Sequence, residues 1–110
     1  MSEGSKSPYL GELEELVLLA ILKLGPSAYG VPIQEALQGA DRHLSVGALY
    51  VTLDRLQRKG FVTSWRGEPT PERGGRAKRY YRVESSGKLA IYQAESSRKK
   101  LNPEPAPGRA

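Results

Sequence analysis

The sequence contains no cysteine and only one histidine, His43. The absence of cysteine excludes disulfide bonds, thiolate zinc sites and thiol nucleophiles, and it is compatible with a reducing compartment. The sequence also lacks a phosphate-binding loop, a GxSxG motif and any metal-ligand spacing. The clustered acids Glu12, Glu14 and Glu15 have no matching ligands nearby. We therefore expect no catalytic site, no metal and no cofactor.

Long hydrophobic runs are absent too. The longest, from Leu16 to Leu22, is far shorter than the ~20 residues that a membrane helix needs. No signal peptide is recognisable, so we expect a cytoplasmic protein without a membrane partner. A length of 110 residues suits one compact domain. The compositions of residues 1–8 and of the proline-rich residues 102–110 predict a disordered arm and a disordered tail.

Positive charge is in excess and unevenly distributed. The chain has 17 Lys+Arg against 12 Asp+Glu, a net charge of +5 and a pI near 9.6. Before residue 20 acids outnumber bases, whereas residues 55–82 hold most of the arginines. This segregation favours one face for a polyanion such as nucleic acid and another face for a different contact.

The first half of the chain predicts two helices. Strong helix formers run from Glu12 to Leu24, and Gly25-Pro26 ends them. A second helix is expected over 30–38, with Pro32 tolerated in its first turn and Gly39 closing it.

The first helix is apolar nearly all round between Leu16 and Leu22, whereas a surface helix carries one apolar stripe. The other helices of the domain could enclose it completely. We favour the alternative, a subunit interface, because large exposed apolar patches are unfavourable in monomers.

A third helix is predicted over 45–59, capped by Ser45 and closed by Gly60. Its helical wheel places an aliphatic stripe inward, formed by Val46, Leu49, Leu53 and Leu56. The outward face is small at its start and basic toward its end, and it comprises Gly47, Ala48, Val51, Asp54, Arg55 and Arg58, flanked by Tyr50 and Thr52. Such a face suits a DNA major groove, although an aliphatic stripe opposite a solvated basic face is also ordinary in globular proteins.

A basic β-hairpin follows this helix. Residues 61–65 and 80–83 are aromatic and β-branched, and a Gly/Pro-rich tip separates them. The tip region carries Arg73, Arg76, Lys78 and Arg79, which could reach the DNA backbone or minor groove. A flexible solvated loop is the alternative. A fourth helix is predicted over 85–101, capped by Ser85 or Ser86, with a narrow apolar side formed by Leu89, Ala90, Tyr92 and Ala94.

Three segments together resemble the PadR family of bacterial winged-helix transcriptional regulators: LGELEELVLLAILKLGPSAYG, GALYVTLDRLQRKGFVTS and GEPTPERGGRAKRYYRV. The resemblance covers about residues 9–92. It implies a mainly α fold with a small β-hairpin, that is, a winged helix-turn-helix over 9–84 (three helices and a two-stranded wing) followed by a C-terminal dimerisation helix over 85–101. The single short C-terminal helix is similar to the compact subfamily, which leaves less surface for dimerisation.

The resemblance further implies a homodimer on operator DNA, usually a repressor. Dimerisation would use the C-terminal helix against the partner's first helix, and we assign to it Leu10, Leu13, Val17, Leu18, Leu89 and Tyr92. We expect double-stranded DNA to contact Ser45, Gly47, Ala48, Tyr50, Val51, Thr52, Arg55, Arg58, Arg73, Arg76, Lys78 and Arg79. Helix 45–59 would enter the major groove of a palindromic site, and wing 66–79 would lie on the backbone or minor groove.

A small-molecule inducer is a further possibility that the resemblance raises. Trp65 and Tyr92 are the nearest ligand candidates, but each suits a packing role equally well, Trp65 beneath the wing and Tyr92 in a core or interface. A winged helix used only to dock another protein is the remaining alternative. Basic residues on both the wing and the third helix argue against it.

Overall fold

The computed structural model describes residues 9–68 and 77–102. Four α-helices, a short 3-10 turn and a two-stranded hairpin follow one another as α1 (Glu12–Leu24), η2 (Gly25–Ser27), α2 (Gly30–Gly39), α3 (Val46–Arg58), β1 (Val62–Arg66), β2 (Arg79–Val83) and α4 (Ser85–Leu101). The predicted fold class, a winged helix-turn-helix with a C-terminal helix, is confirmed. The predicted bounds of α1 and α4 agree with these, and those of the other predicted helices and strands differ by one residue at one or both ends.

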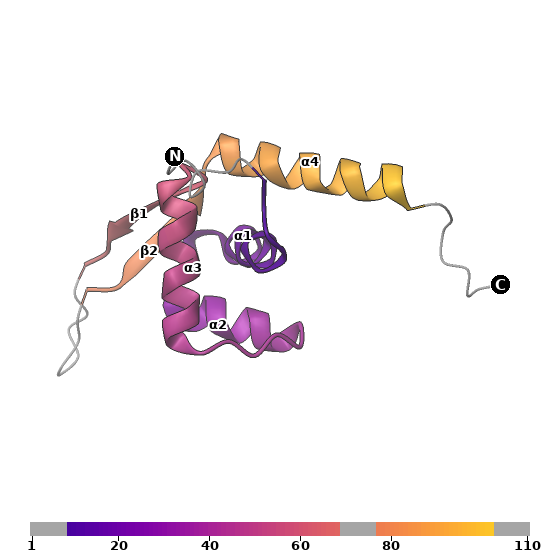
Figure 1. The fold of residues 1–110 in the computed structure, drawn as a ribbon. Coiled ribbons are helices and arrows are strands. Elements are labelled where there is room, and N and C mark those ends of the chain that lie inside the picture. Colours follow the sequence, from indigo (N-terminus) through magenta and orange to yellow (C-terminus); the bar gives the residue numbers. More distant parts are fainter. Residues whose placement is uncertain (1–8, 69–76, 103–110) are drawn as a thin grey trace.

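Helix α1 forms the centre of the domain. In Figure 1 it is seen end-on, with α3 beside it, α2 below and α4 above. Its inward residues Val17, Leu18 and Ile21 are almost fully buried. They pack with Ile33 and Leu37 of α2, with residues of the hairpin and α4, and with the α3 stripe Leu49, Leu53 and Leu56. Neighbours within the same chain therefore bury α1 on several sides, but the complete enclosure of our alternative is not found, because Leu19 and Leu22 are 37% and 42% exposed.

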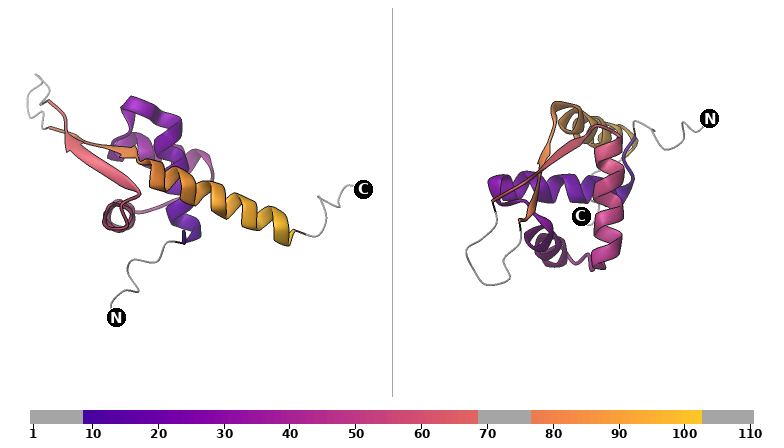
Figure 2. Two further views of the ribbon diagram at one scale, coloured as in Figure 1. Left: turned by 90° about the horizontal axis from the view of Figure 1, so that it is seen from above. Right: turned by 90° about the vertical axis from the view of Figure 1, so that its left-hand side faces the viewer.

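The hairpin projects from the helical body, as Figure 1 and the left view of Figure 2 show. Strands β1 and β2 are antiparallel, with Val62 opposite Val83 and Arg66 opposite Arg79. The hairpin is tied to the segment after α1, because the Tyr81 backbone N–H donates to the Ala28 carbonyl over 2.9 Å. Gly60, whose φ of +81° suits glycine best, turns the chain from α3 into this hairpin.

Helix α4 leaves the hairpin directly. It begins at Ser85, and Glu84 occupies the N-cap position without a side-chain capping bond. The predicted Ser85 or Ser86 cap is therefore wrong: the Ser86 hydroxyl instead donates to the Gly60 carbonyl over 2.7 Å. Only Gly87, Ala90 and Ile91 of α4 are buried, and its C-terminal half extends past the body of the domain (Figure 1).

Candidate nucleic-acid interface

The N-terminal half of α3 exposes mainly small side chains. The Ser45 hydroxyl accepts a hydrogen bond from the Ala48 backbone N–H over 3.1 Å, as predicted for an N-cap. Gly47, Ala48 and Val51 are exposed, and Tyr50 is 43% exposed. Small exposed residues at the start of a helix allow its backbone to approach the floor of a major groove.

The C-terminal half of α3 is charged, and its two arginines have different partners. Arg58 donates to Asp54 over 2.5 Å, one helical turn away. The Arg55 Nε lies 3.9 Å from Oε2 of Glu14, on α1. Arg55 therefore lies on the α1 side of the helix, whereas Asp54 and Arg58 lie on its outward surface.

A groove runs between α3 and the hairpin. It is lined by Gly47, Tyr50, Val51, Asp54, Gln57, Arg79 and Tyr81. A chain of hydrogen bonds joins its two walls: Arg79 donates to the Ser64 hydroxyl over 2.9 Å, and Ser64 donates to the Gln57 side-chain oxygen over 3.1 Å. The Ser64–Gln57 bond thus links the hairpin to α3.

Tyr81 forms the buried floor of this groove and is only 4% exposed. Burial raises the pKa of its phenol, and the nearby Tyr50 and Asp54 raise it further, while Arg79 opposes them. Tyr50 leans over the start of α2, where a Cβ on Gly30 would overlap its hydroxyl. Glycine at position 30 thus makes room for the Tyr50 ring.

The wing carries cations at the outer end of the hairpin. Arg66 and Arg79 are opposite each other in the strand register, an arrangement that is unfavourable unless an anion lies between or above them. Lys78 places its Nζ 5.1 Å from the centre of the Tyr29 ring, and Tyr29 packs edge-on against Tyr80 at 5.3 Å. The predicted contacts Arg73 and Arg76 lie outside the described residues.

Two positions on α3 differ from the helical-wheel prediction. Thr52 was expected to reach DNA, but it is 2% exposed, and its hydroxyl donates to the Ala48 carbonyl over 2.9 Å. Val46 was expected in the core but is 56% exposed. The buried face of α3 is rotated slightly from the predicted one. Thr52, at one edge of the apolar stripe, is therefore buried, and Val46, at the other edge, is exposed.

Sequence reasoning gave no role to Gln57, Tyr81 or Tyr29, and it placed Asp54 outward without assigning it a contact. For Asp54 and Gln57 the helical wheel held the signal, because both fall beside Tyr50 or Gly47 on the outer half of α3. Tyr81 and Tyr29 could not be found in this way. Only the tertiary fold brings Tyr81 into the groove beside α3 and Tyr29 against Tyr80 of the hairpin.

The residues assigned to dimerisation fall into three environments. Val17 and Leu18 are fully buried within their own chain, so that assignment is wrong for both. Leu10 and Leu13 pack partly against the core. Leu89 and Tyr92, at 55% and 67% exposed, lie on the side of α4 opposite the buried Ala90 and Ile91. The sequence predicts one apolar side of α4, but the structure has two: Ala90 and Ile91 face the core, and Leu89 and Tyr92 face outward.

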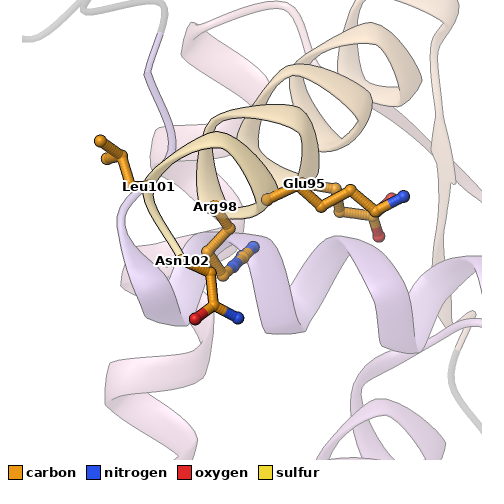
Figure 3. Close-up of a pocket in the computed structure, with 5 residues that line it drawn as sticks. Glu95, Arg98, Leu101 and Asn102 are labelled. Carbon is orange, nitrogen blue, oxygen red and sulfur yellow. The ribbon is translucent and has the colours of Figure 1, made fainter. Parts of the chain in front are cut away.

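Other apolar side chains on α1 and α4 are exposed as well. Leu19 and Leu22 of α1 are 37% and 42% exposed, and Leu101 of α4 is 81% exposed. Figure 3 shows the last turns of α4, where Arg98 points toward α1 and Leu101 points away beside a hollow that Glu95 and Asn102 also line. Arg98 donates to Glu15 of α1 over 2.5 Å, which holds α4 along α1.

The two ligand candidates do not share a site. Trp65 is 42% exposed and lines a recess of about 400 Å³ with Leu22, Pro26, Tyr81 and Lys88 among its other walls. Its indole stacks on Tyr80 at 5.9 Å between ring centres. Tyr92 borders a different, smaller hollow on α4. Within 9–68 and 77–102, no group of three or more His, Cys, Asp or Glu could hold a metal ion, and no helix of these segments could cross a membrane.

Comparison with known proteins decides the family. The model of the Transcriptional regulator PadR-like family matches residues 18–93. The chain belongs to this family. Its members are transcriptional regulators and not enzymes. No curated protein matches the chain.

Solved structures share the fold. A PadR-like transcription factor from Bacteroides fragilis is 27% identical, with 82% of each chain covered and a TM-score of 0.67. A PadR family transcription regulator from Clostridium difficile R20291 is 21% identical, with 83% of this chain and 91% of that chain covered and a TM-score of 0.70. Bacillus subtilis PadR, solved in complex with operator DNA, is 18% identical, with a TM-score of 0.60 over 87% of this chain and 50% of that one.

Proposed function

We propose that this regulator binds double-stranded DNA through the groove between α3 and the hairpin. The N-terminal half of α3 enters the major groove, and the wing cations Lys78 and Arg79 contact the backbone or the minor groove. The observation that carries the proposal is the geometry of this groove. An exposed helix surface with small residues lies beside a basic hairpin, and a hydrogen bond between Ser64 and Gln57 links the two. The operator complex of Bacillus subtilis PadR, which has the same fold, supports it.

We further propose that the protein acts as a homodimeric repressor on a palindromic operator. The exposed apolar side chains of α1 and α4, Leu19, Leu22, Leu89 and Tyr92, supply a surface that a second copy would cover. Two copies related by a two-fold axis would place their α3 helices in successive major grooves, about 34 to 36 Å apart. Occupation of a promoter by such a dimer would block transcription.

The salt dependence of binding tests the DNA contact. If each subunit neutralises about three phosphates, the slope of log K against log salt for the dimer is roughly −5. Lys78→Ala should reduce that slope by roughly 2 for the dimer, at about 0.9 per phosphate, and weaken all sequences alike. Lys23→Ala is the matched control, because Lys23 is an exposed cation of α1 that does not line the groove. Equal slopes for both variants and the wild type would contradict the proposed contact.

Sedimentation equilibrium tests the dimer separately. Tyr92→Glu should shift the protein toward monomer, because it places a charge on the apolar side of α4 that the core does not cover. Gln38→Glu adds the same charge to an exposed position of α2 and should leave the mass unchanged. A monomeric wild type at tens of micromolar would reject the dimer while leaving the DNA contact open.

The recess beside Trp65 supports a second function, binding of an apolar effector. Trp65 is the one tryptophan of the chain, so its fluorescence reports directly on occupancy of the recess. Titration with flat aromatic compounds should quench this emission and release DNA at the same concentrations. Compounds that quench the emission without changing DNA binding would reject a regulatory role for the recess.

A further inference from the structure

The groove proposed to bind DNA contains an acid. Among the described residues that line it, Asp54 is the only one with a carboxylate. Its side chain is 61% exposed, on the same outward surface of α3 as Gly47 and Val51. A negative charge at this place repels phosphates, so the residue needs an explanation if the groove takes DNA.

The neighbouring Arg58 occupies only part of the carboxylate. Arg58 donates to Oδ2 over 2.5 Å, and Oδ1 accepts no hydrogen bond from the described part of the chain. Both side chains of this pair are more than 60% exposed, and an exposed pair one helical turn apart contributes little to helix stability. The pair is therefore poorly explained as a structural element, and one acceptor oxygen of this exposed side chain is available to a ligand.

The chemistry of that oxygen is selective. A carboxylate only accepts hydrogen bonds, and the donors on the base edges of the major groove are the amino groups of cytosine and adenine. Guanine and thymine present acceptor oxygens there, which a carboxylate repels. Cytosine is the preferred partner, because its edge presents the amino donor without the adjacent N7 acceptor of adenine.

We propose that Asp54 is a specificity-determining residue that selects cytosine at one position of each half-site. Arg58 holds its carboxylate in place and offsets its charge. The same carboxylate weakens binding to every sequence that lacks the amino donor, so it raises selectivity partly by rejecting wrong sites. This inference rests on the proposed function, since it requires that α3 faces base edges.

Selection from a randomised duplex library tests the inference, and it can be carried out before the operator has been identified. The wild type should enrich sequences with a cytosine at a fixed place in each half-site. Asp54→Ala should lose that preference by roughly tenfold, the size of one base contact, and should bind random DNA several-fold more tightly. Asp54→Asn should shift the preference toward adenine, because an amide offers both a donor and an acceptor to the adenine edge.

Glu35→Ala is the control, because Glu35 is an exposed acid of α2 outside the groove. It should select the wild-type sequences. Thermal melts of all variants show that any change does not come from unfolding. If folded Asp54→Ala enriches the same sequences as the wild type, the inference is overturned and the proposed function stands. If the wild type itself enriches no sequence, the proposed function fails and the inference fails with it.

Discussion

The ion pair between Glu14 and Lys59 gives the sharpest prediction about stability. It joins the start of α1 to the end of α3, with 2.8 Å between Lys59 Nζ and Glu14 Oε1 and side-chain exposures of 7% and 6%. Glu14 also accepts from the Gly11 backbone N–H over 2.8 Å, and Lys59 also donates to the Tyr9 carbonyl over 3.1 Å. The two side chains of the ion pair are nearly closed to water, whereas Tyr9 is exposed.

Glu14→Leu should destabilise the fold by about 3 kcal/mol, because it leaves the Lys59 ammonium buried without its counter-charge. The value lies at the low end of the range for broken buried pairs, since Lys59 keeps the Tyr9 carbonyl. In a domain of this size the loss corresponds to a fall in Tm of roughly 12 to 24 °C. Lys59→Met should cost less, because Arg55, 3.9 Å from Glu14, can compensate part of the stranded carboxylate.

The double variant Glu14→Leu/Lys59→Met should recover most of the stability, to within about 1.5 kcal/mol of the wild type, because no buried charge remains unpaired. Urea unfolding of the four proteins measures the coupling, at one fixed protein concentration because dimerisation would make stability concentration-dependent. Glu12→Gln is the control: Glu12 pairs with Arg42 at the surface, and its loss should change stability by less than about 1 kcal/mol. Additive effects of the two single variants, or losses no larger than that of the control, would refute the reasoning.

Three further predictions concern individual positions. Because burial raises the pKa of Tyr81 in the folded state, its neutral phenol stabilises the fold below pH ~10, and this contribution is lost as the pH rises through the folded-state pKa. In urea unfolding, Tyr81→Phe should therefore lose less stability than the wild type between pH 9 and pH 11. Gly87→Ala should destabilise by about 2 kcal/mol through overpacking, because its Cβ would lie 2.5 Å from the Phe61 carbonyl oxygen, whereas Gly39→Ala, which meets open space, should not lower the Tm. Ser45→Ala should cost about 1 kcal/mol through loss of the α3 N-cap, measured by thermal melting; an unchanged Tm would show that the cap contributes nothing.

Much of the fold could be predicted from the sequence because local signals agree with the tertiary structure. Gly25-Pro26 and Gly60 end helices where the chain turns, and Ser45 caps α3 as expected. The hairpin follows from two aromatic and β-branched segments on either side of a tip that cannot be helical. At these places local propensity and the tertiary structure favour the same conformation.

The errors arise where tertiary packing decides. Val17 and Leu18 sit on an all-round apolar helix, and the sequence could not show that neighbouring elements of the same chain bury them. Thr52 lies at the edge of an apolar stripe, where a small shift in the packing direction moves a residue from solvent to core. Arg55, whose side chain is 49% exposed, stays a predicted DNA contact, but the sequence could not show that it lies 3.9 Å from Glu14 of α1. Long-range contacts of this kind leave no periodic signal in a single sequence.

Binding to DNA from the region upstream of its own gene, with a large excess of random duplex as competitor and at near-physiological salt, tests the central claim most directly. The account predicts binding that resists the competitor and maps to a palindrome whose half-sites lie about one helical turn apart. Complete competition by random duplex would contradict sequence reading by the groove between α3 and the hairpin.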